Sequence, residues 1–157
     1  MNKDEERIKR LFPSYFRLFE LPEGAREEEI IVYRACKSCN CDKESFTPSF
    51  EEQGCQYFKD DDPKDPGLYS LSTYEKPKDI KRFVKHNSEY GKPYKIAIGT
   101  TDLSCGLVQR TREREKKRKD SHVDWWLYKE AKPYKSFKMI DDFETYLEEY
   151  NKKGGNN

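Results

Sequence analysis

The strongest constraint on the fold is a seven-residue run of alternating character, His122 to Tyr128 (HVDWWLY). Successive side chains of a β-strand point to opposite faces of a sheet, so Val123, Trp125 and Leu127 share one face, here called the first face. The remaining side chains alternate onto the opposite, second face: His122, Asp124, Trp126 and Tyr128. We expect the first face to lie in the core and to be more buried than His122 and Asp124.

The second face of this strand has two interpretations. An imidazole, a carboxylate, an indole and a phenol together form the kind of surface that a small-molecule or peptide cleft requires. Alternatively, the face is a semi-buried packing surface on which His122 and Asp124 hydrogen-bond to each other or to a neighbouring loop. Buried Trp and Tyr side chains with satisfied polar tips are common. The residues alone leave both interpretations open.

Hydrophobic periodicity predicts the remaining elements. Together with 122–128, strands are expected from β-branched, aromatic or alternating runs at 29–36, 68–74, 94–101 and 136–140. Amphipathic segments predict helices over 77–90 and 141–151, the second capped by Asp141 or Asp142. Since strands and helices mix without a regular βαβ rhythm, we expect one α+β domain over residues 1–157. Its central sheet is mostly antiparallel and flanked by two or three helices.

Three segments stand apart from these elements. Residues 1–22 carry apolar side chains at helical spacing, which predicts a helix docked on the core with a break near Phe12, because Pro13 cannot continue a regular helix. Residues 37–67 show almost no periodicity and are expected to be a long irregular loop, which is typical of functional or mobile segments. Residues 152–157 are expected to be a disordered tail.

The charge balance limits the partners that the chain attracts. There are 31 basic and 30 acidic residues, which leaves no bulk attraction to nucleic acid or anionic membrane. No apolar run is long enough to cross a bilayer, and the first residues lack the apolar region of a signal peptide. Five cysteines, an odd number, point to reduced thiols. We therefore expect a soluble, cytoplasmic protein that engages no membrane.

Four of the cysteines are crowded enough to suggest a metal site. Thiolates from Cys36, Cys39, Cys41 and Cys55 could close a tetrahedral zinc site in the irregular segment. However, one CxxC that overlaps a CxC is not the paired pattern typical of structural zinc. Cys36 also ends an apolar strand, where a free thiol behaves as a small hydrophobe. Free thiols and no metal are therefore expected, with zinc as the alternative.

A charged run follows the expected strand at 94–101. Residues 109–120 (QRTREREKKRKD) hold seven basic and three acidic side chains, among them Arg110, Arg112 and Arg114. The run could form a local patch that contacts phosphate. Runs of this kind are more often solvated loops or helix faces, and no aromatic residue interrupts this one to stack on bases. Nucleic-acid binding is thus possible but not favoured.

Residues 99–128 resemble small uncharacterised proteins carried by phages and mobile elements of Gram-positive bacteria. The resemblance rests on three motifs: Ser104-Cys-Gly106, Gln109-Arg-Thr111 and His122-Val-Asp-Trp-Trp-Leu-Tyr128. It implies a habitat for the chain and no particular activity.

The order of elements is similar to that of the ADP-ribosyltransferase superfamily. Those enzymes carry an Arg or His on a first strand, a Ser-Thr-Ser-like second strand and a Glu on a later strand. Here Arg34 lies in IIVYRAC, and Ser70-Leu-Ser-Thr73 in the second expected strand. The resemblance implies an NAD pocket with Arg34, Ser72 and Asp124 as catalytic residues. The chain departs from the family in offering Asp124, or Glu130 further on, in place of the Glu.

The function favoured by these features is that of an accessory protein, encoded by a phage or mobile element, that binds a host protein or a small nucleotide. No cofactor is expected. The residues expected to contact the ligand or partner are Ser70, His122, Trp126, Tyr128, Arg110, Arg112 and Arg114. The alternative is an NAD-binding enzyme, active or degenerate, of the ADP-ribosyltransferase type. A third hypothesis is a zinc-stapled nucleic-acid binder.

Overall fold

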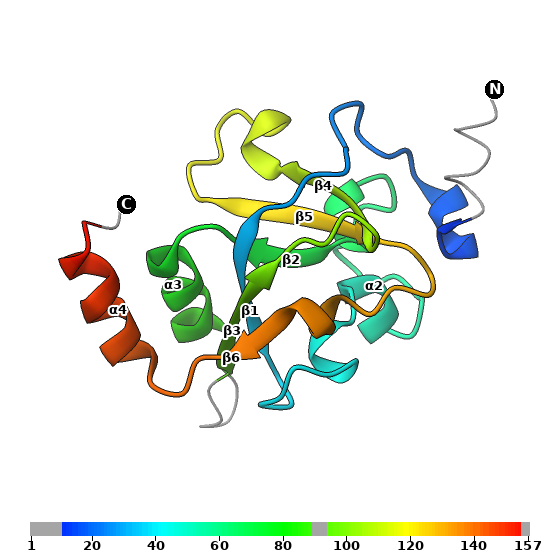
Figure 1. Cartoon of the computed structure of the whole chain (residues 1–157). Coiled ribbons are helices and arrows are strands. Elements are labelled where there is room, and N and C mark those ends of the chain that lie inside the picture. Colours follow the sequence, from blue (N-terminus) through cyan, green and yellow to red (C-terminus); the bar gives the residue numbers. More distant parts are fainter. Residues whose placement is uncertain (1–10, 89–93, 155–157) are drawn as a thin grey trace.

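The computed structural model describes residues 11–88 and 94–154, which form one antiparallel six-stranded sheet with helices around it (Figure 1). The strand order is β4-β5-β2-β1-β3-β6. In chain order, the strands are β1 (Ile31–Cys36), β2 (Leu71–Tyr74), β3 (Lys95–Thr100), β4 (Gly106–Arg110), β5 (His122–Leu127) and β6 (Phe137–Met139). The α-helices of the described residues are α2 (Ser49–Glu52), α3 (Pro77–Asn87) and α4 (Phe143–Lys152). The α+β class with a flanked antiparallel sheet is confirmed.

Short 3-10 helices make up much of the rest. They are η1 (Ser14–Leu18), η2 (Glu44–Phe46), η3 (Pro66–Tyr69), η4 (Thr111–Glu113) and η5 (Pro133–Ser136). Of the helix expected over 1–22, residues 1–10 lie outside the described residues, Leu11 is helical, and η1 begins after Pro13. The expected break near Phe12 is confirmed. None of the helices in the described ranges has the length and apolar character that crossing a membrane needs.

Strand β4 is the largest departure from the prediction, which placed residues 102–120 in a loop and a charged run. It pairs along β5, with Leu107 opposite Trp126 and Val108 opposite Trp125. Its sequence, GLVQR, is too short and too mixed to indicate a strand, and its pairing depends on the neighbouring strand. The outer edge of β4 is covered by a two-way backbone bridge between Arg26 and Val108.

Other boundaries shift by a few residues. The strand expected at 68–74 begins at Leu71, because Pro66–Tyr69 turn into η3 under the cap of Asp65, whose side chain accepts from the Gly67 amide. Asp142 caps α4 as expected, with its carboxylate accepting from the Thr145 amide at 3.1 Å. Helix α4 continues to Lys152, so the expected tail at 152–157 begins later, and residues 155–157 lie outside the described part. The helix predicted over 77–90 is α3, which ends earlier, at Asn87, and residues 89–93 lie outside the described part.

The segment 37–67 is more ordered than its sequence suggests. It contains η2 and α2, which bury Phe46 and Phe50. Ser38 Oγ lies 2.8 Å from a carboxylate oxygen of Asp42, and the Tyr69 hydroxyl donates to the Pro63 carbonyl at 2.6 Å. Aromatic anchors and side-chain hydrogen bonds replace regular periodicity here. Outside these short helices the segment is irregular, as expected, and these contacts fix its course.

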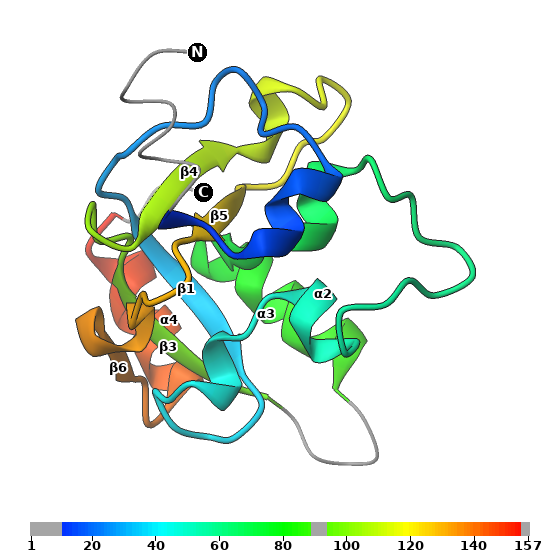
Figure 2. The same ribbon diagram turned by 90° about the vertical axis from the view of Figure 1, so that its right-hand side faces the viewer.

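The two faces of the sheet are covered differently. On the first face, Trp125 packs with Phe137, whose ring meets that of Phe46 from η2. On the second face, α3 covers the strands around β1, with Ile80 buried against Tyr33. The N-terminal segment lies over β4 and β5 (Figure 2). It packs there with residues of α2 and η3 in a mainly aromatic cluster: Phe12, Phe19, Phe50, Tyr69, Leu107 and Trp126.

The expected difference in burial between the two faces of β5 is found only in part. All six residues of the strand are buried. Val123 and Trp125, at 0% exposed, are more buried than His122 at 6%, as predicted. The prediction fails for Asp124, which is also 0% exposed because η3 covers it, and for Leu127, which is 8% exposed.

Candidate functional site

Asp124 lies at the centre of a polar cluster on the second face of β5. Both of its carboxylate oxygens are occupied: Ser70 Oγ donates to Oδ1 at 2.5 Å, and Thr111 Oγ1 and Arg114 Nη1 donate to Oδ2 at 2.8 and 2.7 Å. A buried carboxylate needs such donors to remain charged. These four residues and His122 are called the Asp124 network below. The structure thus brings together four of the residues predicted from sequence, and Thr111 completes the group.

His122 joins the network through Thr111. The Nδ1 atom lies 2.5 Å from Thr111 Oγ1 and 4.0 Å from Asp124 Oδ1. Since the single hydroxyl proton of Thr111 is donated to Asp124, Nδ1 carries the proton and donates to Thr111. Burial lowers the pKa of His122 to about 4, so the ring is neutral at pH 7. Burial raises the pKa of Asp124, but His122, Arg114 and the hydroxyl donors outweigh it, and the net direction is downward.

The network is closed on its outer side. The Arg114 guanidinium carbon lies 5.7 Å from the centroid of the Trp126 ring, and the Trp126 indole donates to the Pro66 carbonyl at 2.9 Å. A Cβ added to Gly67 would lie 3.5 Å from Arg114 Nη2 and 3.7 Å from Asp124 Oδ1. The backbone of η3 therefore lies directly over the carboxylate. The cleft interpretation of the second face is not supported at Asp124, where hydrogen bonds within the chain take up the donors and acceptors.

The three residues implied by the transferase resemblance do not converge. Ser72 lies directly opposite Asp124 in the register of β2 and β5, so both side chains lie on the second face. Arg34 alternates with Tyr33, whose ring lies on the second face under α3, and so points to the first face. There its guanidinium donates to the backbone carbonyls of Ser45 and Ser72 at 2.9 and 3.0 Å. The sheet itself separates Arg34 from Asp124.

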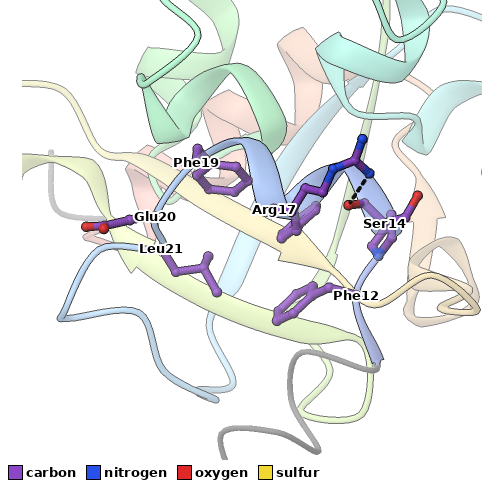
Figure 3. Close-up of a pocket in the computed structure, with 8 residues that line it drawn as sticks. Phe12, Ser14, Arg17, Phe19, Glu20 and Leu21 are labelled. Atoms are coloured by element: carbon purple, nitrogen blue, oxygen red, sulfur yellow. Dashed lines mark hydrogen bonds between the residues drawn. The ribbon is translucent and has the colours of Figure 1, made fainter. Parts of the chain in front are cut away.

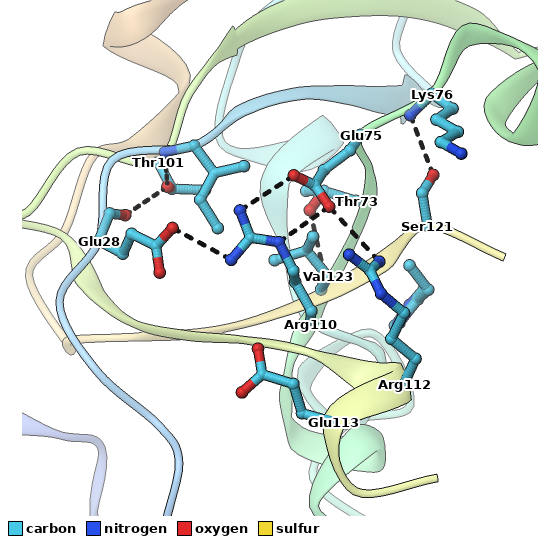
Figure 4. A network of polar contacts seen from close by, with 12 residues as sticks. Glu28, Thr73, Glu75, Lys76, Thr101, Arg110, Arg112, Glu113, Ser121 and Val123 are labelled. Atoms are coloured by element: carbon cyan, nitrogen blue, oxygen red, sulfur yellow. Dashed lines mark hydrogen bonds and ion pairs between the residues drawn. The ribbon is translucent and has the colours of Figure 1, made fainter. Parts of the chain in front are cut away.

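The arginines of the charged run do not form one basic patch. Arg110 lies between two carboxylates, at 3.1 Å from Glu28 and from Glu75, and Arg112 approaches Glu75 at 3.6 Å (Figure 4). Arg114 belongs to the Asp124 network on the other face. These cations are neutralised within the chain, which disfavours phosphate contacts at Arg110 and Arg112. The lysines of the run remain exposed: Lys116, Lys117 and Lys119.

The four cysteines of the zinc alternative differ in burial and in their neighbours. Cys36 is buried, and burial raises the pKa of its thiol to about 11. Cys41 Sγ lies 3.4 Å from Met139 Sδ, whereas Cys39 and Cys55 are exposed. Over residues 11–88 and 94–154, no group of three or more His, Cys, Asp or Glu side chains is arranged to hold a metal ion. The geometry gives the zinc alternative no support.

Tyr128 lies beyond the end of β5 and links the second face to the N-terminal segment. Its ring is 4.9 Å from that of Phe12, and its hydroxyl donates to Glu27 at 3.1 Å. Phe12 in turn stacks on Phe16 with ring centroids 4.5 Å apart. The second face of β5 is therefore bordered at this end by the aromatic side chains of Tyr128, Phe12 and Phe16.

Two adjoining cavities open beside these aromatic side chains, and Figure 3 shows the first of them. The first has a volume of about 590 Å³ and is lined by Phe12, Pro13, Ser14, Phe16, Arg17, Phe19, Glu20 and Leu21. The second, of about 490 Å³, shares Arg17, Phe19 and Glu20 with it and adds Leu18 and Lys64. Together they are called the N-terminal groove. Cavities of this size are typical of ligand sites.

Two prolines explain why this segment leaves open space. Pro13 directly precedes η1, and Pro22 follows Leu21. Since proline does not fit in the interior of a helix, the chain breaks at Pro13, as expected, and residues 14–18 form a short 3-10 helix instead of a regular helix that continues to residue 22. Its apolar side chains then surround a hollow instead of forming a single buried stripe. The sequence pattern was compatible with a docked helix, and only the proline pair signalled this outcome.

The sequence analysis also missed three residues that complete the Asp124 network. Thr111 bridges His122 and Asp124, Gln109 accepts from Arg114 Nη1 at 3.0 Å, and Gly67 covers the carboxylate. Thr111 is the one small hydroxyl side chain inside the charged run, which was the available signal.

No family model matches this chain, and neither does any curated protein or solved structure.

Proposed function

We propose that this chain is an accessory protein that acts by binding a segment of a partner protein in the N-terminal groove. The observation that supports this most strongly is a contrast between two sites. The side chains suited to chemistry lie in the Asp124 network, where they are buried and bonded to one another. The open volume lies instead along residues 12–21, where apolar side chains dominate.

The surroundings of the groove favour a macromolecular partner. Leu18 is 40% exposed at the groove, and Leu11, next to the lining residue Phe12 in the chain, is 41% exposed. Exposed apolar side chains around a hollow are typical of interaction surfaces. A partner segment could cover this surface while it places a side chain in the cavity.

Context supports a cytoplasmic protein encoded by a phage or mobile element. All five cysteines are free, as in a reducing compartment. The resemblance of residues 99–128 to proteins of phages and mobile elements supports the accessory role. Binding of a small nucleotide is the other possible use of the groove, and the experiments below include it.

A selection experiment tests the proposal. A displayed library of short random peptides is panned against the full chain, and the enriched peptides are measured against two variants. Leu18→Asp places a charge at the groove, whereas Leu103→Asp changes a leucine of similar exposure, 48%, away from it. We expect enriched peptides to lose at least tenfold in affinity with Leu18→Asp and to bind Leu103→Asp normally. Peptides that bind both variants equally would contradict the groove as the binding site.

A further inference from the structure

We propose that the segment taken by the N-terminal groove is acidic and apolar: a bulky apolar side chain enters the first cavity, and a neighbouring carboxylate meets Arg17 and Lys64. This inference rests on the proposed function and adds the chemistry of the partner. It follows from the different linings of the two adjoining cavities.

The first cavity suits an apolar side chain better than a nucleotide base. Its ring faces are largely used within the protein, because Phe12 and Phe16 stack on each other, and Phe19 stacks on Tyr69 with centroids 4.2 Å apart. Phe12 is only 4% exposed. A base needs an open aromatic face and polar groups that recognise its edge. The walls instead offer ring edges and the aliphatic side chain of Leu21, which an aliphatic or aromatic side chain can contact.

The second cavity carries two cations that have no carboxylate partner in the described part of the chain. Neither Arg17 nor Lys64 forms an ion pair among the described residues, although both side chains are exposed. The aspartates beside Lys64 form no ion pair with it in the described part of the chain: Asp62 accepts from the Lys64 amide and Asp65 from the Gly67 amide. A guanidinium and an ammonium on one rim favour a carboxylate.

Among the described residues that line the two cavities, Glu20 is the one acidic side chain, and Arg17 and Lys64 are the two basic ones. The arginines of the run 110–118 differ, since each is held by a carboxylate of the chain, as in the Arg118–Asp120 pair at 2.8 Å. The lining of the groove therefore combines open apolar volume with two cations that form no ion pair among residues 11–88 and 94–154.

The test uses the isotope-labelled full chain and three probes: a short peptide with a phenylalanine and a leucine flanked by aspartates, the same peptide with lysines for aspartates, and ATP. Nuclear magnetic resonance maps each site and calorimetry measures affinity. We expect the acidic peptide to perturb residues 12–21 and Lys64 and to bind at least tenfold more tightly than the basic peptide. Its affinity should fall with added salt, because the charges involved are exposed.

A charge-reversed variant and a matched control sharpen the test. In the double variant Arg17→Glu and Lys64→Glu, the preference should invert, so that the basic peptide binds more tightly. The control, Lys116→Glu with Lys117→Glu, makes the same change in net charge at exposed lysines of another loop and should keep the preference of the unmodified chain.

The outcomes separate this inference from the proposed function. Equal binding of both peptides at residues 12–21, or binding of ATP there in place of a peptide, would overturn the acidic partner but leave the groove as a binding site. If none of the three probes perturbs residues 12–21, both the inference and the use of the groove fail.

Discussion

The two faces of β5 show how one strand can bury its side chains by different means. Trp125, on the first face, lies among apolar groups, and its indole nitrogen is buried without a hydrogen-bond partner among the described residues. Trp126, on the second face, is buried equally but donates to the Pro66 carbonyl and stacks near Arg114. The two indoles are neighbours in sequence, but they differ in the interactions that stabilise them: apolar packing for Trp125, and a hydrogen bond with a nearby cation for Trp126.

This difference changes how polar side chains in a strand should be interpreted. The first face is stabilised by removal of apolar surface from water, which is tolerant of small changes in shape. The second face depends on hydrogen bonds that must be complete, since a buried donor or acceptor left unpaired is costly. A carboxylate and an imidazole on a strand can therefore mark a closed structural network as readily as an open site.

The largest effect is expected when the centre of the Asp124 network is removed. Asp124→Leu leaves Arg114 and the Ser70 and Thr111 hydroxyls without their acceptor, so the free energy of unfolding should fall by about 3–5 kcal/mol. Urea denaturation measures the change. Asp141→Leu, at an exposed aspartate before α4, is the control and should alter stability by no more than about 0.5 kcal/mol. A small loss in Asp124→Leu would mean that the network does not hold the second face.

The free energy of unfolding should also depend on pH, because His122 is buried in the same network. His122 has a pKa of about 4 in the folded protein and an ordinary value of 6.5 when unfolded. Between these values the unfolded chain binds a proton that the folded chain does not, so stability is lost as pH falls from about 6.5 to 4. The loss is expected to be about 3 kcal/mol.

The variants His122→Gln and His86→Gln test this assignment. His86 is exposed on α3, so its replacement should leave the pH dependence unchanged. His122→Gln should flatten the stability profile between pH 6.5 and 4, measured by urea denaturation at each pH. A profile that stays as steep in His122→Gln would show that another group carries the loss.

The most direct comparison of the two faces gives a smaller effect. Trp126→Phe removes the hydrogen bond to the half-buried Pro66 carbonyl and the larger ring beside Arg114, at a cost of about 1–3 kcal/mol. Trp125→Phe removes an indole N–H that has no partner in the described part of the chain, so the loss should be less, under about 1.5 kcal/mol. Thermal denaturation of both variants measures the difference. The opposite order would contradict the distinction between the faces.

Much of the fold was predictable because local patterns agree with it. The alternation in HVDWWLY, the apolar run before Cys36 and the cap at Asp142 each indicate their element directly. Strand β4 was not predictable, since its five residues acquire strand character by pairing with β5. The 3-10 helix η3 replaced the start of a predicted strand, because Asp65 and Pro66 favour a turn that alternation does not reveal.

The candidate site was predictable only in part. Ser70, Arg114, His122 and Asp124 were singled out and do meet, but their closure depends on Thr111 and on the backbone of η3, which tertiary packing brings in. The groove could not be predicted, because helical spacing of apolar residues describes a docked helix and a broken one equally well. Pro13 and Pro22 decide between them only once the surrounding sheet is known.

Measuring stability and binding in the same two variants separates the network from the groove most directly. Asp124→Asn removes the buried charge, and the double variant Arg17→Glu, Lys64→Glu reverses the charge of the groove. We expect Asp124→Asn to lower the melting temperature while it keeps the affinity for the acidic peptide measured well below that temperature. The double variant should keep the melting temperature and lose at least tenfold in affinity. If Asp124→Asn abolished binding with an unchanged melting temperature, Asp124 would belong to a functional site and the assignment of the groove would be wrong.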